Sequence, residues 1–172
     1  MLKRILAGMA AISLVVLLGY RAAEGGSDAR QEERDRLAIE KLMWQYTRAL
    51  DSLNGDAYAA VYTPDGQFGS SGNAVKGHDA LKKMITDLRQ RNSDNEAKTG
   101  QKTPGMYHME MNTYIERVDK DHARVEGYWQ TVFAGQGPSV PVRVAAAGRE
   151  VNELVRVNGQ WLIQSRDVAP KE

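Results

Sequence analysis

Three polar residues recur at every second position in the stretch from Tyr107 to Ile115, namely His108, Glu110 and Asn112. The stretch otherwise alternates like a half-buried β-strand, so the three side chains should share one face. A neutral imidazole, with an ordinary pKa of about 6.5, can accept a proton, and a carboxylate bonded to its second nitrogen fixes the tautomer. A phenol can hydrogen-bond an enolate as charge develops on it. Such groups suit proton abstraction beside a carbonyl, followed by loss of water or by isomerisation.

The composition limits the classes of function that need to be considered. The chain has 172 residues, a formal charge of +1, no cysteine, and hydrophobic and charged fractions of 42% and 26%. These values are typical of one globular domain that folds without disulfides, and a near-neutral domain is a poor nucleic-acid binder. His78 and His122 lack the paired spacing of metal ligands, and the segment GSSGNAVKG lacks the phosphate-loop pattern. We therefore expect neither a metal nor an organic cofactor.

The N-terminal residues 1–25 have the layout of an export signal. Lys3 and Arg4 precede an apolar run from Ile5 to Tyr20, and a short polar stretch with small residues follows. The run has 16 residues, whereas a membrane-spanning helix needs about 20. We expect a cleaved signal peptide, with an uncleaved N-terminal membrane anchor as the alternative. In either case the domain, residues 28–170, should lie outside the cytoplasm, either periplasmic or secreted.

Helical spacing of apolar residues predicts three helices in the first half of the chain. Asp28 and Gln31 can form a capping box for a long helix that ends at Asn54-Gly55. Asp56 is expected to cap a short second helix. A third helix should run from residue 78 or 79 to residue 91.

The second half of the chain changes to the two-residue alternation of strands. The polar segment 89–105 before them predicts a loop, either a lid over a site or a disordered connection. Asn158-Gly159 is a strong hairpin signal. Helices followed by antiparallel strands predict an α+β domain whose helices pack on one face of the sheet. The predicted strands are Met106–Val118, Ala123–Ala134, Val142–Val157 and Trp161–Val168.

The order of these elements and four sequence segments resemble the SnoaL-like branch of the nuclear transport factor 2-like superfamily. The segments are YTRALDSLNGDAYAAVYTPDG at 46–66, KGHDAL at 76–81, HMEMNTYI at 108–115 and VNGQWLI at 157–163. The resemblance spans Glu33 to Val168. It implies a cone-shaped α+β domain in which three helices and a curved, mostly antiparallel sheet enclose a pocket.

The resemblance also implies roles for single residues. In dehydratases of this branch an aspartate late in the first long helix pairs with a histidine on the strand after the third helix, and the matching residues are Asp51 and His108. A tyrosine polarises the substrate oxygen, for which Tyr46 is the first candidate and Tyr62 the second. Asn112 matches an amide found four residues after the histidine.

The sequence departs from the scytalone dehydratase pattern at two positions. Trp129 replaces a second catalytic histidine, and Glu150 replaces a pocket asparagine. Trp129 is expected either to shape an apolar pocket or to fill the core. Phe68, on a short strand, is a further candidate for the pocket wall.

Structural interpretations compete with these roles. A lone histidine on a strand is often structural, and Asp51 lies off the apolar stripe of its helix, as a solvated residue would. Tyr46 lies on that stripe and can equally be a core tyrosine. Glu110 shares the parity of His108 and can be either a second acid of the pocket or a charge at its rim, and we favour the rim.

Together these observations predict a cofactor-independent lyase or isomerase, dehydratase-like, that acts on a small, apolar hydroxy-carbonyl compound. His108 would be the base, Asp51 its orienting partner and Tyr46 the donor. The alternatives are a pocket protein that binds a small ligand without turnover and an interaction module of an envelope complex. We also expect a homodimer, because one sheet face would expose large apolar residues. The residues expected on this face are Tyr107, Met109, Met111 and Ile115, and those expected to touch the substrate are Tyr62, Phe68, Asn112, Trp129 and Glu150.

Overall fold

The computed structural model describes residues 28–70 and 72–171, and the chain divides into two units, residues 1–39 and 40–172. In the first unit, residues 28–39 are helical. Gln31 does not form the expected capping box with Asp28, because its side chain donates to Asp35 at 2.8 Å and accepts from Arg34 at 2.8 Å. The predicted signal peptide or anchor lies outside the described residues. Within the described ranges, no helix combines the length and the apolar character that a membrane crossing needs.

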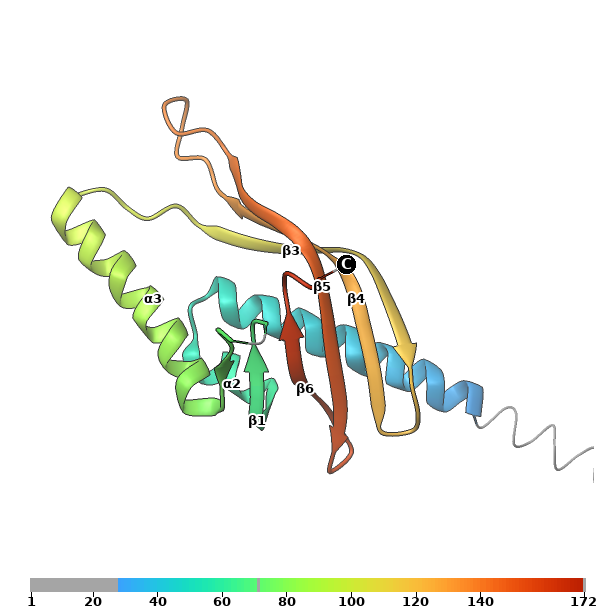
Figure 1. Ribbon diagram of the computed structural model, residues 1–172. Coiled ribbons are helices and arrows are strands. Elements are labelled where there is room, and N and C mark those ends of the chain that lie inside the picture. Colours follow the sequence, from blue (N-terminus) through green and yellow to red (C-terminus); the bar gives the residue numbers. More distant parts are fainter. Residues whose placement is uncertain (1–27, 71, 172) are drawn as a thin grey trace, which may run out of the picture. The chain divides into compact units, whose positions relative to one another are not determined.

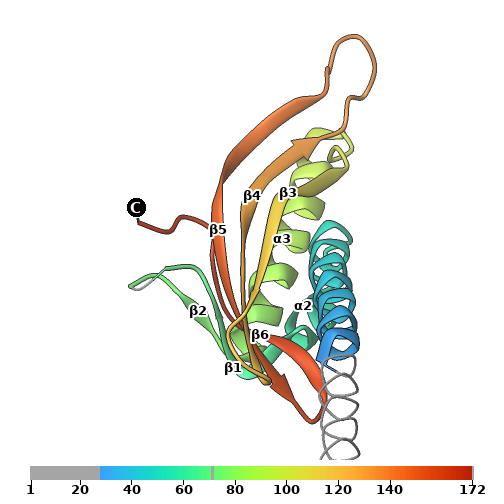
Figure 2. The ribbon, with the colours of Figure 1, turned by 90° about the vertical axis from the view of Figure 1, so that its right-hand side faces the viewer.

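The second unit contains three helices and a six-stranded mixed sheet, which confirms the predicted α+β class. Helical residues 40–51 come first, followed by α2 (Gly55–Ala60) and, after two strands, α3 (His78–Thr99). The sheet order is β2-β1-β6-β5-β4-β3, and only the β1–β6 pair is parallel. Figures 1 and 2 show β3, β4 and β5 as long, bent strands. The strands are β1 (Tyr62–Phe68), β2 (Val75–Lys76), β3 (Met106–Arg117), β4 (His122–Phe133), β5 (Arg143–Val157) and β6 (Gln160–Asp167).

Short polar contacts fix the ends of these elements. The Asn54 side chain accepts a hydrogen bond from the backbone of Ala57 at 3.0 Å, so Asn54 caps α2 and the expectation for Asp56 was wrong. Asn158 and Gly159 have φ values of 51° and 81°, as the tight turn between β5 and β6 requires. The hairpin prediction is therefore confirmed.

Helix α3 is two turns longer than the sequence predicted. It continues to Thr99 through most of the segment that we expected to be a loop. The segment has little apolar surface, but side chains one turn apart stabilise it, for example Gln90, which donates to Asp94 at 2.8 Å. The helix ends at Gly100, whose φ of 68° suits a glycine. Only residues 100–105 connect α3 to β3.

A β-bulge changes the direction of side chains along β3. The pairing with β4 shifts between Met111 and Tyr114, and Asn112 has a φ of 51°. Beyond the bulge, Ile115 lines a hollow together with His108. The expectation that Ile115 lies on the opposite face was therefore wrong.

A core of apolar and aromatic side chains supports the inner face of the sheet. Leu81 and Ile85 of α3 are fully buried, as are Val125, Leu154 and Ile163 of the sheet. Next to them lies a group of three tyrosines whose ring centroids are 5.3 to 6.3 Å apart, namely Tyr46, Tyr58 and Tyr62. Close packing of this kind holds neighbouring side chains in single rotamers.

Candidate functional site

A cavity of about 190 Å³ lies between the helix of residues 40–51 and the inner face of the sheet. Its wall is largely apolar, with a few polar groups that converge on it, which is the usual character of small-molecule sites. The residues that line it are Tyr46, Leu50, Phe68, His108, Glu110, Trp129, Thr131, Ala146, Arg166 and Val168.

Asp51 and His108 form a hydrogen-bonded pair at the edge of this cavity. Oδ1 of Asp51 lies 2.8 Å from Nδ1 of His108 and also accepts the backbone N–H of His108 at 3.0 Å. Because a carboxylate can only accept, Nδ1 carries the proton and Nε2 is the basic nitrogen. The two side chains are only 10% and 16% exposed, so the solvated interpretation of Asp51 was wrong.

Tyr46 meets the same cavity from the helix. The guanidinium carbon of Arg166 lies 4.1 Å from the centroid of the Tyr46 ring, within the range of a cation–π contact. Burial raises the pKa of Tyr46, although Arg166 opposes the shift. The phenol is therefore neutral at physiological pH and can donate a hydrogen bond. Tyr46 is buried, as the core interpretation predicts, and it also lines the cavity, while its role as the donor stays a prediction.

Beside Tyr46, Arg166 binds two carboxylates and an amide. Its Nη2 donates to Oε1 of Glu110 at 2.8 Å and to Oε2 of Glu150 at a very short distance. Its Nη1 donates to Oδ1 of Asn152 at 2.7 Å. Asn152 in turn donates to Oε1 of Glu150 at 3.2 Å. The four side chains form one connected, almost fully buried network, and two of them, Glu110 and Arg166, also line the cavity.

The network holds one cation, Arg166, beside two carboxyl groups, Glu110 and Glu150. Burial raises the pKa of Glu110 to about 7, with Arg166 opposing the shift and Glu150 adding to it. Burial alone would lower the pKa of Arg166, but the surrounding Tyr46, Glu110 and Glu150 raise it above its ordinary value. Glu110 is thus a buried acid inside the site, and the expectation that it is a rim charge was wrong.

The other predicted site residues divide between the cavity and its surroundings. Phe68 and Trp129 line the cavity, and Nε1 of Trp129 donates to the carbonyl oxygens of Arg149 and Val168 at 3.1 and 2.9 Å. These bonds hold the indole ring in the wall. A ring held in this way supports the pocket-shaping interpretation of Trp129.

Three predicted site residues do not line the cavity. Tyr62 is fully buried, and its hydroxyl lies 3.2 Å from that of Tyr58. Glu150 lies in the layer below, bonded to Arg166. Asn112 is exposed and lines a different hollow with Met111 and Tyr128, because the bulge in β3 turns it away. The structure therefore does not place these side chains where a substrate in the cavity would touch them.

Arg166 and Asn152 were not among the sequence candidates. Regular alternation along β6 would put Arg166 on the face opposite Trp161 and Ile163. The β5–β6 pairing shifts between Ile163 and Ser165. The shift reverses the alternation of side chains along β6 and turns Arg166 inward. The alternation of β3 did indicate that Glu110 lies on the same face of the strand as His108.

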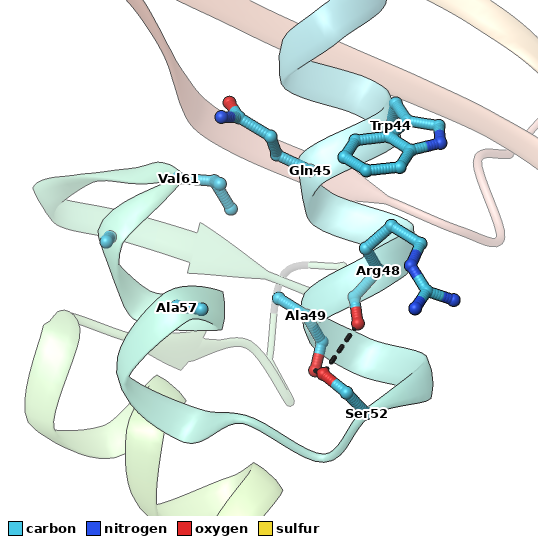
Figure 3. A pocket seen from close by; sticks show the side chains of 8 residues that line it. Trp44, Gln45, Arg48, Ala49, Ser52, Ala57 and Val61 are labelled. Atoms are coloured by element: carbon cyan, nitrogen blue, oxygen red, sulfur yellow. Dashed lines mark hydrogen bonds between the residues drawn. The ribbon is translucent and has the colours of Figure 1, made fainter.

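A second hollow, of about 410 Å³, lies on another side of the helix (Figure 3). Trp44, Gln45 and Arg48 face it from the helix, and Ala57 and Val61 face it from α2 and the residue after it. Ser52 bonds the carbonyl oxygens of Arg48 and Ala49 at 2.7 and 3.3 Å, as helix-terminal serines do. This hollow has no acid–base pair, so the smaller cavity is the candidate site. Among the described residues, no group of three or more acidic or histidine side chains could hold a metal ion.

The fold and the cavity define the class of protein, a nuclear transport factor 2-like α+β domain with a pocket on the inner face of its sheet. Residues 31–167 match the SnoaL-like domain, and the chain belongs to this family. The family includes enzymes of the dehydratase and isomerase type as well as ligand-binding members. No curated protein is significantly similar in sequence to the chain.

Solved structures agree with the assignment of the fold. A nuclear transport factor 2-like protein from Novosphingobium aromaticivorans with a cystatin-like fold has 17% identity and a TM-score of 0.68, covering 83% of this chain and 86% of its own. A candidate scytalone dehydratase from the same organism has 22% identity and a TM-score of 0.62, covering 81% and 85%. A protein of unknown function from Mycobacterium tuberculosis has 20% identity and a TM-score of 0.67, covering 84% and 76%. Identities this low carry the fold and not the activity.

Proposed function

We propose that the chain is a cofactor-independent lyase of the dehydratase type, or an isomerase, for a small hydroxy-carbonyl compound. The observation that carries the proposal is the hydrogen bond from His108 to Asp51 at the edge of an apolar cavity. It leaves Nε2 as a base and prepares a carboxylate to stabilise the imidazolium. Neutral Tyr46 is the donor for the oxygen on which an enolate develops its charge.

The cavity favours a small, largely apolar substrate. Its volume of about 190 Å³ is below the roughly 300–1,000 Å³ of sites that take drug-sized ligands. Phe68 and Trp129 offer aromatic surfaces to such a ligand, and Thr131 and Ala146 keep part of the wall narrow. A monocyclic ketone fits this description.

We further propose that the domain is exported and forms a homodimer. Export rests on the layout of residues 1–25. Dimerisation rests on an exposed apolar face of β3 and β4, which we call the tyrosine face, formed by Tyr107, Met109, Tyr114 and Tyr128. Apolar surface of this kind is commonly covered by a partner.

The test of the activity separates an enzyme from a binder. The protein is incubated with a panel of small β-hydroxy ketones, beginning with β-hydroxypropiophenone, and the enone product is followed by absorbance. Exchange of the α-protons of propiophenone in deuterated water is followed by NMR, because it needs the base but no leaving group. We expect both processes to be catalysed. Binding of these ketones without proton exchange or loss of water would favour the ligand-binding alternative.

A further inference from the structure

The cluster around Arg166 holds one positive charge against two carboxyl groups. The side chains of Arg166, Glu110 and Glu150 are 3%, 11% and 0% exposed. Two carboxylates cannot both be ionised at such a site without leaving one negative charge buried and uncompensated. One proton on the pair removes the imbalance, so the question is which carboxyl group carries it.

Hydrogen bonds favour Glu110 as the protonated member. Glu150 accepts from both Arg166 and Asn152, and donors stabilise the ionised form of a carboxyl group. For Glu110 the described residues supply one such bond, from Arg166 to Oε1. Its second oxygen, Oε2, is therefore the one that can carry a proton.

The groups that face Glu110 from other elements do not reverse this preference. His108 on the same strand and Tyr46 on the helix share the cavity with Glu110; His108 already has Asp51 as its partner, and burial keeps Tyr46 neutral. Glu40, on the same helix, lines an adjoining hollow with Glu110 and adds negative charge. Additional negative charge also favours the protonated carboxyl.

We propose that Glu110 is the general acid of the site and protonates the hydroxyl group that leaves the substrate. This inference rests on the proposed function and adds a second catalytic residue to it. Glu110 and His108 are two residues apart on one face of β3 and line the same cavity. Acid and base can therefore act on adjacent carbons of one small substrate.

The reaction balances without any further reactant. Nε2 of His108 removes the proton on the carbon beside the carbonyl, and the electron pair of that bond forms an enolate. The enolate pair then forms the carbon–carbon double bond as the carbon–oxygen bond of the hydroxyl group breaks. The proton of Glu110 goes to the departing oxygen and gives water. Transfer of a proton from the His108 imidazolium to the Glu110 carboxylate restores the site.

One test needs no substrate. The carboxyl resonances of isotope-labelled glutamates are followed by NMR as a function of pH in the wild type and in Glu110→Gln. We expect one carboxyl resonance of the wild type to report a protonated group up to near-neutral pH, and we expect this resonance to be missing in the variant. A Glu110 resonance that titrates in the ordinary acidic range of glutamate would overturn the proposal, whatever the reaction proves to be.

A second test uses two leaving groups. Loss of water from β-hydroxypropiophenone needs an acid, whereas the equally small β-chloropropiophenone loses chloride, a stable anion, and does not. In Glu110→Gln we expect the first reaction to fall about 10²–10⁴-fold and the second less than about tenfold. Glu116→Gln, an exposed change on the same strand, is the matched control and should affect neither reaction.

The outcomes separate this proposal from the proposed function. Equal losses for both leaving groups would make Glu110 a structural residue and refute its role as acid, while the function would stand. If the wild type accelerates neither reaction and exchanges no α-proton, the proposed function itself fails. In that case the role of Glu110 in catalysis fails with it, and the NMR titration alone decides its protonation.

Discussion

One carboxylate oxygen of Asp51 holds both the ring and the backbone of His108, at 2.8 and 3.0 Å. The two residues are 57 positions apart in the chain, so this contact ties the end of the first helix to the start of β3. Because the backbone bond fixes the strand and the ring bond fixes the tautomer, a single residue positions the base in both respects.

Replacing His108 with Gln removes the proton acceptor but keeps the size of the side chain and part of its hydrogen bonding. We expect the rate of water loss from the best hydroxy ketone to fall by about 10²–10⁴-fold while the protein remains folded. Initial rates and circular dichroism provide the measurement. His122→Gln is the matched control, because His122 is an exposed histidine that is also bonded to an aspartate. Wild-type rates in His108→Gln would remove the histidine from the mechanism.

Replacing Asp51 with Asn removes the negative charge beside His108 but keeps an oxygen that can accept. Because one oxygen accepts both N–H groups of His108, the amide oxygen takes that place and keeps the tautomer, and the imidazolium loses the carboxylate that stabilises it. We expect turnover to fall at least about 10²-fold, with a loss of stability of about 1 kcal/mol. Asp119→Asn changes the exposed Asp119–His122 pair in the same way and should leave turnover unaffected. NMR of the ring nitrogens checks that the tautomer is kept, and wild-type turnover in Asp51→Asn would contradict this explanation.

Replacing Arg166 with Met leaves Glu110 and Glu150 buried without their cation. Breaking a buried ion pair from one side typically costs about 3–5 kcal/mol, and we expect a loss of that size in the free energy of unfolding. Denaturant titration measures it. In Arg124→Met, which removes a half-buried arginine beside Glu126 and Glu153, the loss should stay below about 1 kcal/mol. Similar losses in the two variants would show that the buried network contributes little.

Glu110 should make the stability depend on pH in the direction opposite to an ordinary ion-paired carboxylate. Burial raises its pKa from 4.5 to about 7, so between these values the folded state binds more protons than the unfolded state. Its contribution is complete below pH 4.5 and is lost as the pH rises to about 7. The loss is on the order of 3 kcal/mol.

The measurement is the difference in unfolding free energy between the wild type and Glu110→Gln at several pH values. Subtracting the variant cancels the other titrating groups, so the difference should fall with rising pH and level off above neutrality. Glu116→Gln provides the comparison for an exposed carboxyl on β3. A difference that does not change with pH would show that the pKa of Glu110 is the same in the folded and the unfolded protein.

The tyrosine face should mediate the homodimer. Tyr128 is half exposed on β4, in register with Met111 on β3. Replacing Tyr128 with Asp puts a charge into the expected interface, and we expect light scattering at micromolar concentration to report a monomer. Val118→Asp, at an exposed site after the end of β3, is the control and should remain dimeric. A monomeric wild type would refute the interface.

The sequence predicted the fold well because periodicity reports which face of an element is buried. It located the four long strands, the Asn158-Gly159 turn and the starts of α2 and α3 to within a few residues. It could not predict the length of α3 beyond residue 91, because that part of the helix is polar on all sides and is held by side-chain bonds such as Gln90 to Asp94.

The candidate site was predicted only in part, for a geometric reason. Asp51, His108 and Tyr46 came from the family resemblance, and the helical pattern alone argued against Asp51. Arg166 was missed because one irregular pairing in β6 reverses the alternation on which strand predictions depend. A single sequence does not reveal such a shift, since no residue type marks it at Gln164.

The bulge in β3 has a consequence for insertions and deletions in this strand. Asn112 and Thr113 together occupy the space opposite Gly127, where a Cβ would lie 3.1 Å from the carbonyl oxygen of Met111. Deleting Asn112 would leave Thr113 in regular register, with His108, Glu110 and Ile115 still directed inward. What would be lost is the local twist that the surplus residue introduces. A chain shortened by this one residue should therefore keep its chemical groups but hold them on a flatter strand, with a more open cavity for bulkier ketones.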